Sequence, residues 1–197
     1  MAESLDNYPV IVLAYEGTED LMRALWEKRF SGTVMILSVP EDYSVMEVLL
    51  DIVTDAAIGE DFVLVQANTV PLGPTSVETI LFPAVYVSAG NGDVKYSSRV
   101  PVRLSKERVV EYLSGLKETS DFDTEKCIRD CTVPNGRPLK VSHASPDGYF
   151  FQVLSGSPCR HKVIEALLSR RFLGCSLTGW NAISDLLQDY AKSDRNE

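Results

Sequence analysis

The stretch that decides the fold is residues 82–113, FPAVYVSAGNGDVKYSSRVPVRLSKERVVEYL. Its apolar runs at 84–87 and 94–96 are rich in the β-branched and aromatic residues that favour strands. Between them, Asn91-Gly92 supplies the positive φ angles that a tight hairpin turn requires. The stretch therefore predicts two antiparallel strands, the first of which begins after Phe82-Pro83.

A helix is expected directly after this hairpin. Ser105 is a good N-cap, because its hydroxyl can accept a hydrogen bond from a free N–H of the first helical turn. The apolar residues that would face the core are Val109, Val110 and Leu113.

The residues before the hairpin alternate between strand and helix signals. Apolar runs at 9–14, 33–39 and 62–67 predict three strands, and we expect the first two to be buried on both faces. A helix that follows Thr18 would carry Leu21, Met22, Leu25 and Trp26 into the core. Acidic residues after Pro40 suit the start of a second helix, over 43–57.

The C-terminal part shows a different pattern. Residues 117–123 are polar and predict a linker, so we expect one domain over 1–118 and an extension over 119–197. In the extension, the sequence predicts a short helix at 124–131 and a hairpin of strands at 139–143 and 149–154. Two further helices are expected, one after Ser157-Pro158 and a last one over 180–190.

Composition and charge narrow the function classes. The formal charge is -9; residues 1–118 hold 9 Lys or Arg against 18 Asp or Glu (9 − 18 = −9), and residues 119–197 hold 10 of each. Such an acidic surface argues against a nucleic-acid partner. The chain also lacks a signal-peptide pattern and an apolar run of about 18 residues, so we expect no membrane segment and a cytoplasmic or nuclear location.

The order of elements over about residues 8–116 resembles that of the thioredoxin superfamily. The resemblance implies an α/β fold, with a mixed sheet flanked by helices and here followed by an α+β extension. Pro83 stands where that family places its cis-proline, and Val39-Pro40-Glu41-Asp42 stands where it places its redox turn. Residues 1–126 contain no cysteine, so disulfide exchange is not expected. The chain is most similar to redox-inactive members that act as binding modules, such as UAS domains.

The resemblance implies a partner-binding surface formed by the turn and the proline. Its residues would be Pro40, Glu41, Asp42, Tyr43, Phe82 and Pro83. A second feature follows from helical spacing alone: Glu47, Asp51 and Asp55 recur every four residues, opposite Met46, Leu49 and Val53. We call Glu47, Asp51 and Asp55 the acidic stripe. It would be either a solvated helix face or a docking face for a basic partner.

A different function class is suggested by residues 65–70, VQANTV. They resemble the DADTV segment of GT-A glycosyltransferases, where two carboxylates hold a metal ion against a nucleotide sugar. Gln66 and Asn68 retain the oxygen donors but lose both charges, and a hard cation depends on anionic ligands. The alternative is therefore a degenerate or metal-independent transferase that binds a nucleotide sugar.

The four cysteines and two histidines all lie in the C-terminal part. Free thiols are the expected state in a chain without a secretory signal. A metal site formed by Cys127, Cys131, Cys159 and His161 is a weaker hypothesis, since the spacings differ from those of common zinc motifs. The leading interpretation is a non-catalytic protein-binding or scaffold subunit of an intracellular assembly, with no cofactor or metal.

Overall fold

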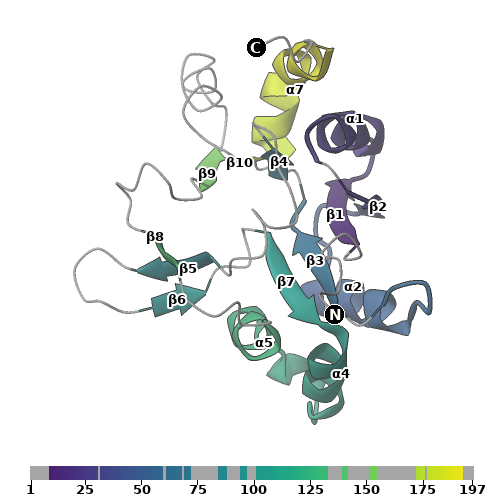
Figure 1. Cartoon of the computed structure of the whole chain (residues 1–197), viewed down its shortest axis with the longest axis vertical. Coiled ribbons are helices and arrows are strands. Elements are labelled where there is room, and N and C mark those ends of the chain that lie inside the picture. The colour runs from purple at the N-terminus through teal and green to yellow at the C-terminus, as the bar shows by residue number, and fades with distance from the viewer. Residues whose placement is uncertain are drawn as a thin grey trace, which may run out of the picture.

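The computed structural model describes residues 9–30, 32–59, 61–67, 69–71, 84–87, 94–96, 101–132, 139–141, 151–154, 172–175 and 177–192. Within these residues the chain forms a four-stranded sheet with helices on both faces and two three-stranded sheets (Figure 1). The predicted α/β class is confirmed. None of the described helices combines the length and the apolar character that a bilayer-spanning segment requires.

The four-stranded sheet has the order β2-β1-β3-β7. Strands β1 (Val10–Tyr15), β2 (Val34–Val39) and β3 (Asp61–Val65) are parallel, and β7 (Val102–Ser105) is antiparallel to β3. The first three strands match the three apolar runs in the sequence. Parallel pairing requires crossover connections, and the helices α1 (Glu19–Arg29) and α2 (Val45–Thr54) provide them.

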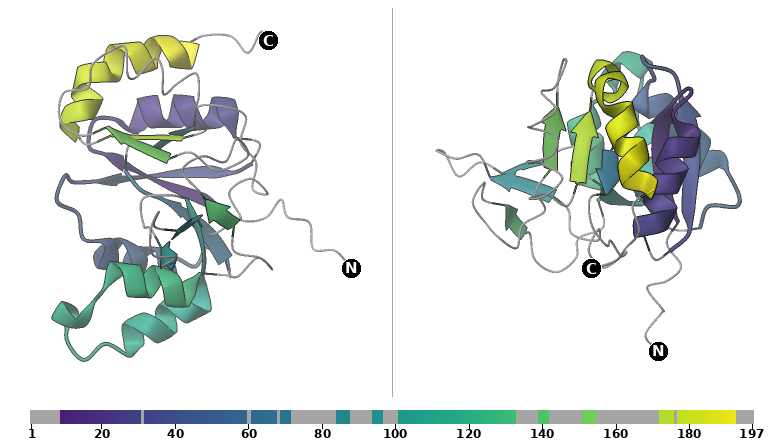
Figure 2. Two further views of the ribbon diagram at one scale, coloured as in Figure 1. Left: turned by 90° about the vertical axis from the view of Figure 1, so that its left-hand side faces the viewer. Right: turned by 90° about the horizontal axis from the view of Figure 1, so that it is seen from above.

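Helices α1 and α2 cover opposite faces of this sheet, as Figure 2 shows. Alternate residues of a strand point to opposite faces. Ile11 and Leu13 accordingly pack in one core with Val48, Leu49 and Ile52 of α2. The face beneath α1 is packed by Met22, Leu25 and Trp26, as the sequence predicts, whereas Leu21, which was also expected in the core, is only half-buried.

Strand β2 differs from the prediction. All residues of β1 except the last are buried, whereas Val34 to Leu37 of β2 are only half-buried. The reason is position, since β2 lies at the end of the strand order and has β1 on one side only among the described strands. An apolar run predicts a strand but does not show whether that strand is central.

The predicted helix after Ser105 is α4 (Lys106–Ser114), and the Ser105 side chain caps it by accepting from the Arg108 N–H. Val109 is buried, but Val110 is 43% exposed, so the expectation that Val110 faces the core is wrong. A 3₁₀ turn, η2 (Thr119–Asp121), lies where a linker is predicted. It leads into α5 (Thr124–Cys131), which matches its predicted bounds and packs against α4.

The hairpin that decided the predicted fold is present, but in another sheet. Strands β5 (Ala84–Val87) and β6 (Val94–Tyr96) are antiparallel, as expected, and β8 (Leu139–Val141) joins them to form a separate three-stranded sheet. The fourth strand of the main sheet is instead β7, which the sequence interpretation missed. The sequence predicts no strand at these four residues and identifies only Ser105, as the helix cap.

A second hairpin prediction is also corrected. Strand β8 pairs with β5, whereas β9 (Phe151–Leu154) pairs in parallel with β10 (Phe172–Cys175). Strand β10 also pairs with β4 (Thr69–Pro71), so strands from both predicted parts of the chain share two sheets. The predicted helix after Ser157-Pro158 lies outside the described residues.

The last helix, α7 (Leu177–Lys192), begins earlier than predicted and packs on α1. Lys28 Nζ at the end of α1 donates to the Ala191 carbonyl at 2.7 Å. A lysine is favourable there because the last carbonyls of a helix carry partial negative charge. Helix α1 therefore lies between the main sheet and α7 (Figure 2).

Candidate functional site

The turn at 40–43 connects β2 to α2. Val39 is the last residue of β2, and the Tyr43 N–H donates to the Pro40 carbonyl at 3.3 Å. The Ser44 side chain then caps α2 by accepting from the Glu47 N–H, so the helix begins at Val45. Pro40, Glu41 and Asp42 are exposed, whereas Tyr43 is half-buried.

Tyr43 anchors the turn to the edge of the sheet. Its Oη donates to Gln66 Oε1 at 3.0 Å, and its ring lies 6.3 Å from the Tyr15 ring, centroid to centroid. Burial raises the pKa of Tyr43 to about 12. Burial, followed by the negative charge of Glu41, also raises the pKa of Tyr15. Both phenols are therefore protonated at neutral pH and can donate hydrogen bonds.

These residues meet because parallel strands end at the same edge of a sheet. Tyr15 ends β1, Val39 ends β2, and Gln66 follows β3. The chain leaves β1 toward β2 on one side and returns to β3 on the other. This reversal makes the carboxyl ends of β1 and β3 a typical place for ligands to bind in open α/β sheets.

The charge at this edge is strongly negative. Glu16, Glu41 and Asp42 are exposed in the loops after β1 and β2, and Asp20 is exposed at the start of α1. Glu19 accepts a hydrogen bond from Ser38 Oγ at 2.5 Å, and this bond lowers the pKa of the Glu19 carboxyl. The sequence contains no lysine or arginine between Arg29 and Lys95, so this stretch supplies no countercharge.

The acidic stripe continues from this edge along α2. Glu47, Asp51 and Asp55 are exposed, and Leu49 on the opposite side is fully buried. At the end of the stripe, Lys106 Nζ donates to the carbonyls of Asp55 and Ile58 at 2.7 and 2.9 Å. Lys106 thus caps the helix end. Leu50, between the acidic residues, is 49% exposed.

The other half of the predicted surface, Phe82 and Pro83, lies outside the described residues. Tyr15, Glu16 and Glu19 were not predicted as part of this site. Tyr15 and Glu16 stand at the end of a predicted parallel strand, which is the signal that could have placed them, and Glu19 follows as the first residue of α1.

The structure describes all of the segment that resembles a metal-binding DADTV motif except Asn68. Gln66 follows β3 as expected, but its side-chain oxygen already accepts from Tyr43, and its carbonyl accepts from the Thr69 N–H at 3.2 Å. Asn68 lies outside the described residues. In the part of the chain that the structure describes, no three Asp, Glu, His or Cys side chains are grouped to hold a metal ion.

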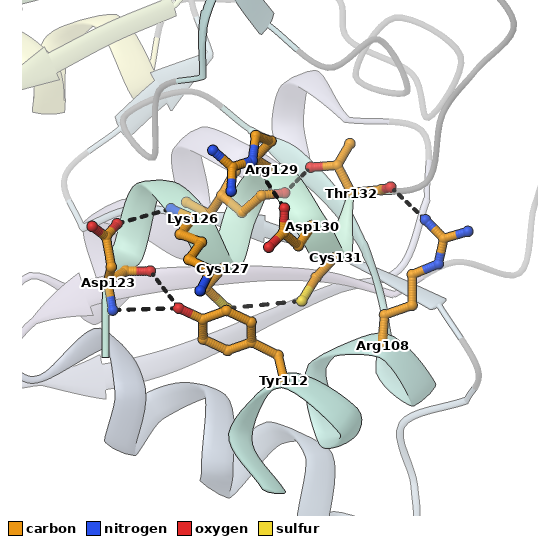
Figure 3. A network of polar contacts seen from close by, with 10 residues as sticks. Arg108, Tyr112, Asp123, Lys126, Cys127, Arg129, Asp130, Cys131 and Thr132 are labelled. Atoms are coloured by element: carbon orange, nitrogen blue, oxygen red, sulfur yellow. Dashed lines mark hydrogen bonds and ion pairs between the residues drawn. The ribbon is translucent and has the colours of Figure 1, made fainter. Parts of the chain in front are cut away.

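Cys127 and Cys131 face each other on α5 (Figure 3). Both are buried and free, with 3.9 Å between their Sγ atoms. The contact with Cys131, together with burial, raises the pKa of the Cys127 thiol. The other two members of the hypothetical metal site, Cys159 and His161, lie outside the described residues.

The polar contacts around this thiol pair hold α4 and α5 together. Tyr112 Oη donates to the Asp123 carbonyl at 3.2 Å, and Arg108 Nη1 donates to the Thr132 carbonyl at 3.2 Å (Figure 3). Asp123 also caps α5 by accepting from the Lys126 N–H at 2.8 Å. These contacts hold α5 against α4, where both thiols are buried.

Comparisons with known proteins identify no relative of this chain. Neither the protein-family models, nor the curated proteins, nor the solved structures give a significant match to this chain.

Proposed function

We propose that this chain is a non-catalytic, thioredoxin-like protein-binding or scaffold subunit that recognises a basic partner. Its contact surface is the turn of Pro40, Glu41, Asp42 and Tyr43 together with the acidic stripe. Phe82 and Pro83, which the resemblance adds to this surface, belong to the proposal as well.

One observation carries the proposal: Glu41, Asp42, Glu47 and Asp51 are all exposed on one connected turn and helix without a basic neighbour in sequence. Exposed like charges repel one another in the free chain, and a basic partner would relieve that repulsion. Such a surface also steers an oppositely charged partner and raises its association rate. The turn itself is held firmly, since Tyr43 is tied to Gln66 and packed on Tyr15.

A redox function has less support. The turn at 40–43 carries no thiol, and nearby carboxylates would raise the pKa of any thiol placed there. The described thiols, Cys127 and Cys131, are buried on α5.

The alternative is a degenerate or metal-independent GT-A-type glycosyltransferase. It is favoured by the place of Gln66, at the carboxyl end of β3 beside β1, where α/β sheets commonly bind nucleotides. The same edge carries Glu16, Glu41 and Asp42, which would repel a diphosphate that no metal ion neutralises.

Charge reversal tests the leading proposal. Glu41→Lys with Asp42→Lys should remove basic proteins from the set that the chain captures, while circular dichroism and thermal stability stay unchanged. The matched control is Asp185→Lys with Asp189→Lys, two exposed residues of α7 that change the net charge equally. A captured set that is the same for both variants and the original chain would refute the proposal.

Thermal unfolding with UDP- and GDP-sugars, with and without Mn²⁺, tests the alternative. A ligand at about 100 times its dissociation constant adds about 2.7 kcal/mol, on the order of 5 to 10 °C for a chain of this size. We expect no shift. A shift of that size would favour the transferase.

A further inference from the structure

Tyr15 and Tyr43 form an aromatic pair at the carboxyl edge of the main sheet. Their ring centroids lie 6.3 Å apart, and the ring planes are tilted by 59°. Tyr15 ends β1 and follows the alternation of Ile11 and Leu13, so it lies on the face of the sheet that α2 covers. Tyr43 stands in the turn before α2. Both residues are half-buried, so the pair is partly open to solvent.

The position of Tyr43 is fixed by contacts within the chain. Its Oη donates to Gln66 Oε1 at 3.0 Å, which joins the turn to the end of β3. Its N–H donates to the Pro40 carbonyl at 3.3 Å. A ring that is already held in place loses little conformational freedom when a ligand contacts it, so more of the contact energy appears as affinity.

Two carboxylates belong to the same turn. Glu41 and Asp42 are both exposed. Burial, and after it the negative charge of Glu41, raises the pKa of the Tyr15 phenol, so the Glu41 carboxylate acts on this ring. A carboxylate attracts a cation by its charge, and the face of a tyrosine ring attracts it by the ring quadrupole. The turn and the aromatic pair therefore favour the same kind of ligand.

A second tyrosine of the chain provides an internal comparison. Lys126 Nζ lies 6.0 Å from the centroid of the Tyr112 ring, where α5 packs on α4 (Figure 3). Tyr112 is half-buried, as Tyr15 and Tyr43 are, and the exposed Glu111 precedes it in the sequence. Tyr112 thus already has a cation of its own chain over its ring, and it serves as the control for a cation site at Tyr15 and Tyr43.

The chemistry of the pair favours a guanidinium over an ammonium group. A guanidinium is planar and weakly hydrated, so it can stack on a tyrosine ring while its fork of N–H donors reaches a carboxylate. An ammonium group is compact and strongly hydrated, so it gains less from contact with a ring. Two half-buried rings beside Glu41 and Asp42 offer both of the contacts that a guanidinium can make.

We propose that Tyr15 and Tyr43, with the carboxylates of Glu41 and Asp42, bind an arginine side chain of the basic partner. The guanidinium stacks on the tyrosine pair and donates to the carboxylates. The proposal rests on the proposed function, because it names the side chain that the acidic turn recognises. It also gives Tyr15 a role that an acidic surface alone does not require.

Two small probes of equal charge test the proposal: N-acetyl-arginine amide and N-acetyl-lysine amide. Each is titrated into the whole chain, and NMR follows the ring signals of isotope-labelled tyrosine. We expect the arginine probe to shift the signals of Tyr15 and Tyr43, but not that of Tyr112. Half-saturation should need about two- to fivefold less of the arginine probe than of the lysine probe. Equal half-saturation by the two probes, or no shift of Tyr15 and Tyr43, would overturn the proposal.

Substitutions then locate the site. Tyr15→Leu removes one ring and Glu41→Gln removes one charge, and each should weaken binding of the arginine probe about two- to fivefold. Glu111→Gln is the matched control, because it removes an exposed carboxylate beside Tyr112, and it should leave binding unchanged. Glu41 is exposed, so Glu41→Gln tests the site even where Tyr15→Leu lowers stability. Equal weakening by Glu41→Gln and Glu111→Gln would overturn the assignment.

The failure of this proposal can be told apart from the failure of the proposed function. If both probes bind equally and Tyr15→Leu changes nothing, the arginine site is wrong, even where Glu41→Lys with Asp42→Lys still removes basic proteins from the captured set. If the arginine probe binds as expected but the charge reversal leaves the captured set unchanged, the arginine site stands and the proposed function fails.

Discussion

Helices α1 and α2 cover opposite faces of the same sheet, but they differ in what lies beyond them. Helix α7 packs on α1, and Lys28 bonds to the end of α7. Helix α2 touches α4 at its side, while Glu47, Leu50 and Asp51 remain exposed. Both helices are amphipathic, so the apolar pattern shows which face packs on the sheet but not whether the outer face is covered. This exposed acidic face is the surface to which we assign the basic partner.

Two neighbouring residues of α2 provide the largest expected contrast. Leu49 is fully buried, whereas Leu50 is 49% exposed. Leu49→Ala should lower the free energy of unfolding by about 2 to 5 kcal/mol. Leu50→Ala should change it by no more than about 0.5 kcal/mol. Urea denaturation measures both. A similar loss for the two variants would mean that the outer face of α2 is covered.

Alkaline titration should show how firmly the turn before α2 is held. The folded state raises the pKa of Tyr43 from 10.0 to about 12, because burial disfavours the phenolate. This contribution to stability is complete below pH 10 and is lost as the pH rises toward 12. The loss should be on the order of 2 kcal/mol.

The variant Tyr43→Phe provides the control for that titration. It should be less stable at neutral pH by about 1 kcal/mol, because the bond to Gln66 is lost. It should then lose less stability than the original chain above pH 10. Equal alkaline losses in the two proteins would show that Tyr43 does not titrate as its burial implies.

A smaller effect is expected when the lysines that cap the C-terminal ends of α7 and α2 are replaced. Lys28 caps α7, and Lys106 caps α2. Replacing either lysine by methionine should cost about 1 kcal/mol locally, which corresponds to about fivefold faster amide exchange in the last turn of the capped helix. Lys28→Met should act on α7 and Lys106→Met on α2. Exchange that accelerates throughout the chain in either variant would contradict these local roles.

Short-range sequence signals correctly predicted helix caps and helix bounds. Ser105 caps α4 as predicted, and α5 spans its predicted residues, because capping and helical spacing are short-range effects. The spacing of the acidic stripe likewise identified the exposed side of α2.

Long-range pairing could not be derived in the same way. The turn chemistry at Asn91-Gly92 predicts that β5 and β6 pair, but not which sheet they join. Strand β7 has only two buried apolar residues, Val102 and Leu104, and its role depends on pairing with β3. The bond between Tyr43 and Gln66 joins residues 23 positions apart, and depends on three strands ending at one edge.

The most direct test of the central claim is carboxyl footprinting of the chain with and without a captured basic partner. Labelling of free carboxylates, read by mass spectrometry, reports which acidic side chains the partner covers. The proposal predicts that Glu41, Asp42, Glu47 and Asp51 become protected, while Asp185 and Asp189 of α7 react as before. Protection confined to α7, with unchanged labelling of residues 41–51, would contradict it.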